Sequence, residues 1–347
     1  MVSISPEEVT IRHPMCSESS SFLASDELYS GILHILTCIE IPLHTFGAYL
    51  IVMKTPKKMK TVKASMLFLH FAGALVDIYL SFIAIPVLTL PVCSGYPLGF
   101  SLVLGIPTSV QVYIGVSCVG VIGVSVLIFF ESRYHQLIIG SSGGISWKRL
   151  IYILFHYLLS ATFIAPAFLD IPSEEYGRVF TFEKIPCIPS DIPFRPGYFV
   201  LATDNLIFCL CLSLMLSFVV PQVVFFVASI FRFLSNTVSH SQTTTRLQRQ
   251  FFIAMCIQLF IPFVVIFSPA LFVVLAIRYD YYNQAANNMA MAAIAFHGVF
   301  TTLTMIMVHT PYRHATLEML HLKSKRSMKT SNNSNIMLQA VNGLHMT

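Results

Sequence analysis

Charged side chains are scarce in this sequence. Asp, Glu, Lys and Arg make up only 11% of its 347 residues, whereas soluble domains carry roughly 25%. The mean hydropathy of +0.74 agrees with this shortage. These values exclude an ordinary cytosolic enzyme, a disordered regulator and a nucleic-acid-binding protein. They predict instead an all-α membrane protein that crosses the lipid bilayer several times.

Sequence patterns for catalysis and metal binding are missing as well. No H-E-x-x-H or G-x-x-x-x-G-K-[ST] string occurs, so two common metal and phosphate motifs are absent. One G-x-S-x-G match, at 140–144, lies in a loop without the strand and helix that a nucleophile elbow requires. The histidines within apolar segments have no common spacing. The sequence therefore predicts no enzymatic activity, no metal site and no cofactor.

Long apolar runs dominate the chain. A helix needs about 20 residues to cross the bilayer core. We predict spans at 29–53, 64–90, 100–130, 150–169, 204–234, 251–277 and 288–308. The polar residues 1–28 contain no apolar signal-peptide core, so the first span is expected to act as its own signal anchor. The chain then consists of this N-terminal segment, a seven-helix bundle over 29–308 and a tail at 309–347.

The distribution of basic residues predicts the orientation of the bundle. Membrane proteins carry more Lys and Arg in cytoplasmic segments than in external ones. With the N-terminus outside, the external segments hold five of the 21 Lys and Arg residues, and the cytoplasmic segments with their span ends hold sixteen. An odd number of spans then places the tail in the cytoplasm. We therefore expect an extracellular N-terminus and a cytoplasmic C-terminus.

Other classes of membrane protein are excluded or weakened by what the spans lack. A retinal-binding protein needs a lysine in its last span for the Schiff base, and 288–308 contains none. A voltage sensor needs regularly spaced arginines within a span, and no predicted span has such a series. No repeat relates the two halves of the chain, which weakens a secondary transporter. A ligand-gated channel or a membrane carrier remains the alternative to a receptor.

Short strings along the chain point to one receptor family. They are F-G-A-Y at 46–49, K-T-P-K-K-M-K-T-V-K at 54–63, G-Y-P-L-G at 95–99, P-C-I-P at 186–189 and H-T-P-Y-R at 309–313. In order and placement they resemble the nematode serpentine chemoreceptors of class H, which belong to the seven-transmembrane G-protein-coupled receptors. Two positions depart from the pattern expected of related receptors, namely Ser132 and Thr310.

The resemblance implies a function. Such a receptor binds a small external molecule, an odorant or a pheromone-like ligand, and activates a heterotrimeric G protein. It also implies a plasma-membrane location, at the endings or cilia of chemosensory neurons. The channel or carrier remains the alternative, because short strings do not themselves describe a mechanism.

Residues at the cytoplasmic ends of the spans are candidates for contacts with a G protein. The string at 131–134 resembles the E/D-R-Y motif of larger receptor families, which implies that its arginine contacts the G protein. The alternatives are an interfacial arginine that extends to the lipid headgroups and a plain membrane anchor at 311–313. The predicted coupling residues are Glu131, Arg133, Tyr134, Arg246, Arg249, Pro311, Tyr312 and Arg313.

Three ionisable side chains lie near the middle of predicted spans: Glu40, Asp77 and His297. An isolated charge at that depth costs several kcal/mol, so each must be paired, protonated or hydrated. In a receptor bundle the first, second and seventh helices are neighbours. We therefore predict one shared cluster that acts as an internal switch, with a purely structural polar cluster as the alternative.

The ligand pocket is expected to be mostly apolar. The sequence has 29 Phe and 14 Tyr, and ligand sites combine apolar walls with a few polar groups that orient the ligand. The predicted ligand-binding residues are Gln111, Tyr113, Asp204 and His297. Asp204 is alternatively a residue of the membrane interface.

Eight cysteines are too few for a disulfide scaffold. Three of them are predicted to face the oxidising side: Cys16, Cys93 and Cys187. The receptor resemblance implies a bridge between Cys93 and Cys187. Cys16 would then be free, or would replace Cys93 in the bridge.

Overall fold

The computed structural model describes residues 22–56, 60–140, 146–236 and 242–320. Within these ranges, seven helical stretches are long and apolar enough to cross a membrane. The stretches are Asp26–Lys54, Lys63–Ile83, Thr108–Ile139, Trp147–Phe168, Leu206–Asn236, Gln248–Arg278 and Gln284–Val308. The protein is therefore a mostly helical, seven-transmembrane bundle, as the sequence predicts.

The elements follow one another along the described chain in this order: η1 (Phe22–Ala24), α1 (Asp26–Lys54), α2 (Lys60–Ile78), η3 (Tyr79–Ile83), β1 (Pro86–Leu88), β2 (Cys93–Pro97), α3 (Phe100–Val103), α4 (Thr108–Tyr134), η4 (His135–Ile139), α5 (Trp147–Thr162), η5 (Ala165–Phe168), α6 (Glu174–Lys184), η6 (Ile192–Phe194), β3 (Phe199–Ala202), α7 (Leu206–Asn236), α8 (Gln242–Arg278), α9 (Gln284–Ala295), α10 (His297–Val308) and α11 (Thr310–Met319). The last transmembrane stretch consists of α9 and α10, which meet at Phe296.

Local sequence explains where several helices begin. The Ser25 side chain accepts a hydrogen bond from Leu28 N and caps α1, and the Asn283 side chain does the same for α9. Side-chain oxygens at this position satisfy backbone N–H groups that have no partner within the helix. Ser173 caps α6, whose first turn also carries two glutamates, and negative charge there is favourable.

The predicted end of the second span and the predicted start of the third span are wrong. The second helical stretch ends at Ile83 instead of continuing to residue 90, and Pro86–Leu88 is a strand. The third does not begin at residue 100, because the short helix α3 is separate and α4 starts after Pro107. The residues between the two helices are apolar but not helical, and composition alone does not separate a buried strand from a span.

These intervening residues provide β1 and β2, which form a small antiparallel sheet with β3 in the order β1-β2-β3. Pro86 lies opposite Pro97, and Leu88 lies opposite Gly95. A Cβ atom at Gly95 would lie 2.2 Å from the carbonyl oxygen of Val87, so the close approach of β1 and β2 requires glycine. The packing of the strands thus explains the presence of glycine at Gly95, in the G-Y-P-L-G string.

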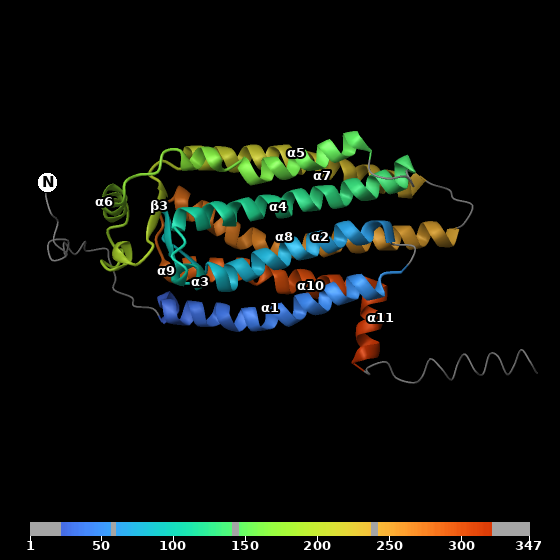
Figure 1. Cartoon of the computed structure of the whole chain (residues 1–347), viewed down its shortest axis with the longest axis horizontal. Helices are drawn as coiled ribbons and strands as arrows, with labels where there is room; N and C mark the ends of the chain where they lie inside the picture. The colour runs from blue at the N-terminus through green and yellow to red at the C-terminus, as the bar shows by residue number, and fades with distance from the viewer. Residues whose placement is uncertain (1–21, 57–59, 141–145, 237–241, 321–347) are drawn as a thin grey trace, which may run out of the picture.

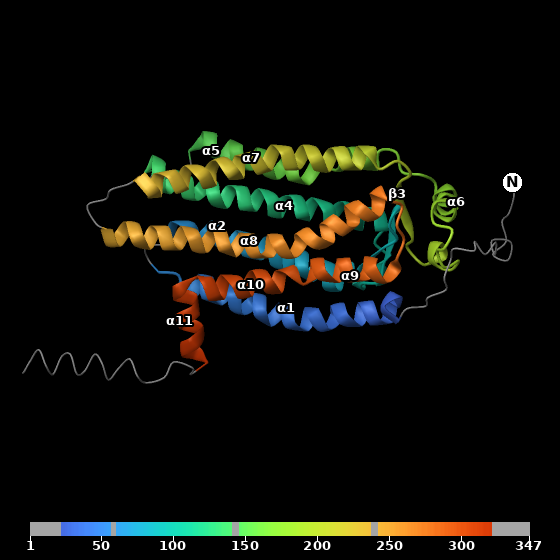
Figure 2. The same cartoon turned by 180° about the vertical axis from the view of Figure 1, so that it is seen from behind.

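The bundle has two different ends (Figure 1). At one end the sheet and α6 cover the helices, and we call this the sheet end. At the other end α11 leaves the bundle at a steep angle, and we call this the α11 end. Seen from behind, α7 and α8 run along the outside of the bundle (Figure 2). They are the least buried of the seven stretches, which suits helices that face lipid.

Separate apolar clusters stabilise the two ends. At the sheet end, Tyr29 and Leu33 of α1 pack with residues of the strands, such as Val87 and Val200. Towards the α11 end, the cluster includes Phe129, Phe252 and Tyr312. Burying a side chain of this size stabilises a fold by roughly 1.5–3 kcal/mol. Further buried polar side chains, among them Glu40, Asp77 and His297, lie between these clusters.

Candidate functional site

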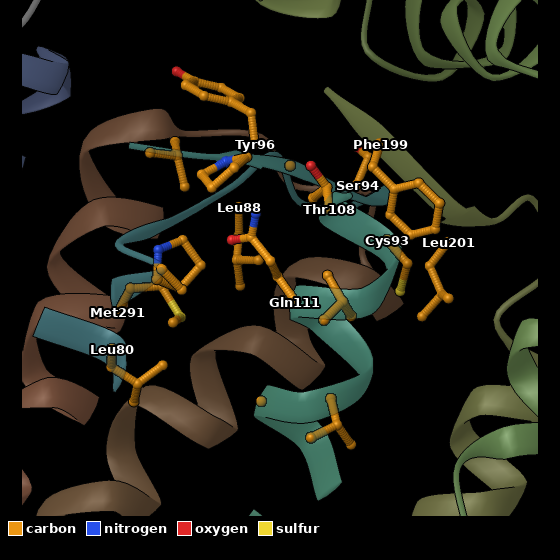
Figure 3. Close-up of a pocket in the computed structure, with 18 of the residues that line it drawn as sticks. Leu80, Leu88, Cys93, Ser94, Tyr96, Thr108, Gln111, Phe199, Leu201 and Met291 are labelled. Atoms are coloured by element: carbon orange, nitrogen blue, oxygen red, sulfur yellow. The ribbon is translucent and has the colours of Figure 1, made fainter. Parts of the chain in front are cut away.

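A cavity of about 330 Å³ lies beneath the sheet (Figure 3). Its volume is at the lower end of the range for small-molecule sites. The strands provide Leu88, Cys93 and Leu201, α4 provides Gln111, and α9 provides Met291. Cys93 and Leu201 lie side by side on one wall in this view. The lining is almost entirely apolar.

The polar side chains of this cavity are occupied by contacts within the protein. Ser101 Oγ donates to Gln111 Oε1 at 2.6 Å, and Gln111 Nε2 donates to the carbonyl oxygen of Ile106 at 2.8 Å. The Tyr79 hydroxyl donates to the backbone oxygen of Gln111 at 2.5 Å. Thr108 Oγ1 donates to a backbone carbonyl at 2.6 Å. The oxygen and the nitrogen of the Gln111 amide are therefore each engaged in one hydrogen bond within the protein.

The hydroxyl groups of the sheet are likewise engaged. Tyr198 donates to Ser94 Oγ at 2.9 Å, and Tyr96 donates to Asp26 Oδ1 at 2.9 Å. Arg195 also pairs with Asp26, at the start of α1. These contacts attach the sheet to the bundle and leave an apolar interior beneath it.

The four predicted ligand residues do not form one site. Gln111 lines the cavity. Tyr113 faces α5 instead, where its hydroxyl donates to the carbonyl oxygen of Ala161 at 2.7 Å. Asp204 lines a neighbouring polar recess, and His297 lies in a polar cluster in the middle of the bundle. The sequence prediction grouped these four residues by their depth in the helices, and depth alone does not give the direction of a side chain.

The polar recess has a volume of about 260 Å³ and lies next to the cavity at the sheet end. Its walls include Lys184, the last residue of α6, and Asp280, which follows α8. Lys184 Nζ lies 2.8 Å from Asp280 Oδ1. Asp204 Oδ1 accepts the Leu206 N–H at 2.9 Å at the start of α7. Charged and polar groups thus surround this recess.

Asp77 is the centre of the buried polar cluster. Its side chain is 1% exposed. His297 Nδ1 lies 3.1 Å from one carboxylate oxygen, and His44 Nε2 lies 3.2 Å from the other. Neither contact has the alignment of a hydrogen bond, and His297 Nδ1 is also 2.9 Å from the carbonyl oxygen of Ile294. The structure thus places Asp77 and His297 together, as predicted, and adds His44.

Glu40 reaches this cluster indirectly. Ser81 Oγ donates to Glu40 Oε2 at 2.7 Å, and Thr37 Oγ1 donates to Ser81 Oγ at 2.9 Å. His44 lies one helical turn after Glu40 on the same face of α1, and His70 Nε2 lies 2.9 Å from the backbone oxygen of His44. The four-residue spacing of Glu40 and His44 is the sequence signal that would have identified His44.

Two glycines make room for this arrangement. A Cβ atom at Gly298 would lie 1.8 Å from Asp77 Oδ2. A Cβ atom at Gly47 would lie 2.8 Å from His70 Cε1 and 2.9 Å from Thr302 Cγ2. Gly47 belongs to the F-G-A-Y string. The close packing of α1, α2 and α10 therefore depends on small residues, as is common between membrane helices.

At the α11 end, Glu131 pairs with Arg149. Arg149 Nε lies 2.8 Å from Glu131 Oε1, and Arg149 Nη2 lies 2.8 Å from Glu131 Oε2. Arg149 Nη2 also donates to Ser132 Oγ at 2.8 Å. Two parallel bonds of this kind make a strong, directional pair. The pair joins α4 to α5, a contact that the sequence pattern at 131–134 does not reveal.

Arg133 is buried beside α8. Its Nη1 donates to Gln136 Oε1 at 2.9 Å, and its guanidinium lies 5.1 Å from the centre of the Phe251 ring. Its Nε has no hydrogen-bond partner among the described residues. A guanidinium above an aromatic ring is held by a cation–π attraction. Arg133 is thus packed inside the bundle and does not lie exposed at the membrane interface.

His309 also packs against Phe251, with 5.3 Å between the ring centres. Its Nε2 lies 2.9 Å from Gln258 Oε1. Burial lowers the pKa of His309 to about 4, because the charged imidazolium is poorly solvated there. The sequence analysis did not identify His309 as a site residue, although it begins the H-T-P-Y-R string.

The other predicted coupling residues surround this region. Tyr134 packs against Phe226, with 5.2 Å between ring centres. The Tyr312 hydroxyl lies 2.8 Å from Thr55 Oγ1, so α11 is attached to the end of α1. Arg249, Pro311 and Arg313 lie nearby in α8 and α11, and Arg249 and Arg313 are exposed. The side chain of Arg246 lies outside the described part of the structure.

The predicted bridge between Cys93 and Cys187 is wrong. Cys93 is a free thiol, and Cys187 is in a disulfide whose partner lies outside the described residues. Cys16 also lies outside them. Cys93 begins β2 and lines the cavity, where burial raises the pKa of its thiol to about 12. The Cys93 thiol is therefore part of the cavity wall and is not bonded to Cys187 in the loop that follows α6.

The described residues contain no group of three or more His, Cys, Asp or Glu side chains arranged to hold a metal ion. In the polar cluster around Asp77, the carboxylate lies between the imidazoles of His44 and His297.

Comparisons with known proteins identify the family. The family model described as "Serpentine type 7TM GPCR chemoreceptor Srh" matches residues 24–322. "Serpentine receptor class H-72" of Caenorhabditis elegans is 29% identical over 332 residues, which cover 94% of this chain and 95% of that protein. The match spans all seven transmembrane stretches. The chain is therefore a multi-pass membrane protein of the Srh family of serpentine chemoreceptors.

Proposed function

We propose that this protein is a chemosensory G-protein-coupled receptor. It binds a small external molecule in the cavity beneath the sheet and activates a heterotrimeric G protein at the α11 end. The observation that carries the proposal is the apolar cavity between the sheet and α4, in a member of a chemoreceptor family. The excess of basic residues on the other side of the membrane supports an external sheet end.

The contacts at the α11 end support the coupling part of the proposal. Arg133 is buried with an unpaired Nε, and its guanidinium is held by Phe251 of α8. A displacement of α8 would release Arg133 towards the cytoplasm, where a G protein would provide hydrogen-bond acceptors. The buried, incompletely paired guanidinium thus favours a state in which a partner satisfies it.

The alternative of a ligand-gated channel or carrier has less support. The buried polar side chains that we described contact one another between α1, α2 and α10 and do not line a continuous path. By family resemblance we also propose that the receptor resides in the plasma membrane of chemosensory neurons, at their endings or cilia.

A cavity-filling substitution tests the proposal. Val116→Phe places a ring in the cavity, whereas Val110→Phe places the same ring on an exposed position of the same helix. In cells that carry a G-protein biosensor, we expect a panel of small apolar odorants to activate the wild type and the Val110→Phe control. Val116→Phe should lose at least about ten-fold in sensitivity, or about 1.4 kcal/mol.

Equal responses from the two variants would exclude the cavity as the ligand site. Ligand-evoked current that persists while G proteins are blocked would favour the channel.

A further inference from the structure

The cavity and the polar recess share part of their walls. Cys93 and Ile277 line both of them. Near Cys93, successive residues of β3 line different spaces: Leu201 lines the cavity and Ala202 lines the recess. Successive residues of a strand point to opposite sides. One thin partition, formed by β2, β3 and the end of α8, lies between an apolar space and a polar one, and the two spaces adjoin at Cys93 and Ile277.

The cavity favours hydrocarbon, because its lining is almost entirely apolar. Its hydroxyl and amide side chains already have partners within the protein, as described for Gln111, Ser94 and Thr108. A ligand that buried a polar group there without a partner would lose roughly 1–3 kcal/mol. A polar group on the ligand must therefore lie elsewhere, and the recess across the partition is the nearest polar space.

The recess has a negative character. Its side-chain charges are one ammonium, Lys184, and two carboxylates, Asp204 and Asp280. Lys184 and Asp280 pair with each other, which leaves the charge of Asp204 without a basic side chain in the lining. The C-terminal ends of α6 and α8 also meet here. Helix C-termini carry partial negative charge and favour cations.

We propose that the cavity and the recess form one two-part site for a single-chain amphiphile with a positively charged head group. The hydrocarbon chain lies in the cavity, and a primary ammonium group lies in the recess near Asp204 and Asp280. This inference rests on the proposed function, because it specifies the ligand class of the same receptor. Cys93, which lines both spaces, is then covered by a bound ligand.

Cys93 provides a direct measurement. The full-length receptor in phosphatidylcholine nanodiscs is treated with N-ethylmaleimide in the presence of decylamine, decanol, decanoate or decane. Mass spectrometry then measures the alkylation of Cys93, a free cysteine, relative to that of glutathione added to the same sample. We expect the decyl compounds to slow the alkylation of Cys93 and to leave that of glutathione unchanged.

Variants of the recess test the charge preference. Asp280→Asn should raise the half-protecting concentration of decylamine by roughly two- to five-fold, the range for partly exposed charge pairs. That of decanol should stay unchanged. Asp204→Asn should act in the same way, and asparagine retains the helix cap. Glu183→Gln is the matched control, since it removes an exposed negative charge next to Lys184 but outside the recess.

The outcomes separate the two-part site from the proposed function. If the aspartate variants weaken decylamine alone, the two-part site is supported. If the aspartate variants change the half-protecting concentrations of all the compounds equally, or if decanoate protects best, the two-part site is wrong while the cavity remains a ligand site. If none of the four compounds, including decane, protects Cys93, both the two-part site and the ligand cavity are wrong.

Discussion

The two ends of the bundle differ in how their buried polar groups are paired. At the sheet end, the side-chain hydroxyls and the amide around the cavity are paired within the protein, so the empty space is apolar. At the α11 end, charges are buried: Glu131 pairs with Arg149, and Arg133 keeps an unpaired Nε. The first end is complete without a polar partner. The second end buries a guanidinium whose Nε has no hydrogen-bond partner among the described residues.

The largest expected effect comes from breaking the buried pair at the α11 end. Arg149→Met leaves the Glu131 carboxylate buried without its partner, and loss of one member of a buried pair costs roughly 3–5 kcal/mol. Thermal unfolding in nanodiscs measures this loss. Arg249→Met, which removes an exposed arginine at the same end, should change stability by less than about 0.5 kcal/mol.

The double variant sharpens this result. Glu131→Gln with Arg149→Met should be more stable than Arg149→Met alone, because no unpaired charge remains. Equal stabilities of the double variant and Arg149→Met would mean that the unpaired Glu131 carboxylate does not cause the loss.

The cysteines at the sheet end should differ almost as strongly. Cys187→Ser removes a disulfide, which typically costs about 2–5 kcal/mol, whereas Cys93→Ser changes one atom of a free thiol in the cavity wall. Surface expression and thermal unfolding should fall clearly for Cys187→Ser and little for Cys93→Ser. Identical losses in the two variants would instead indicate a bridge between Cys93 and Cys187.

Acid should weaken the α11 end through His309. The unfolded chain protonates this histidine near pH 6.5, but the folded protein does so only near pH 4, so the unfolded state binds more protons between these values. Stability contributed by neutral His309 is therefore full above pH 6.5. It declines as the pH falls towards 4, by up to about 3 kcal/mol.

His309→Gln should flatten the dependence of thermal stability on pH. The control His314→Gln, at an exposed position of α11, should retain it. A wild-type curve that is as flat as that of His309→Gln would show that His309 is not buried in its neutral form.

The smallest expected effect concerns the polar cluster between the two ends. If Asp77 and His297 act together as a switch, Asp77→Asn and His297→Ala should be non-additive by roughly 0.5–3 kcal/mol. Asp77→Asn alone should fold and shift ligand sensitivity by roughly five- to hundred-fold. Wild-type signalling by Asp77→Asn, with additive effects in the double variant, would leave a structural cluster without a switch.

Much of the architecture could be predicted from the sequence, because hydrophobicity is a local property. Twenty apolar residues in a helix suffice to cross a bilayer whatever their neighbours are. The family strings were also recognisable, and the structure gives reasons for some of them: Gly95 allows β1 and β2 to approach, and Gly47 allows α1, α2 and α10 to pack. Asp77 and His297 were paired correctly because an ionisable group at mid-span must find a partner.

Other features depended on directions and distances that a linear pattern does not contain. Tyr113 and Gln111 are two residues apart on one helix, yet Tyr113 faces α5 and Gln111 lines the cavity. Apolar residues after Ile83 form strands because the chain there covers the end of the bundle and has neighbours on both sides.

The sequence by itself determined that this chain crosses a membrane seven times and which family it resembles, since both follow from residue types in order. Only the tertiary structure decided which polar groups are already paired. Pairing depends on the few ångströms between side chains of different helices, as between Glu131 and Arg149 or between Gln111 and Ser101. The cavity is apolar because most of its lining side chains are apolar and because its few polar side chains are paired within the protein.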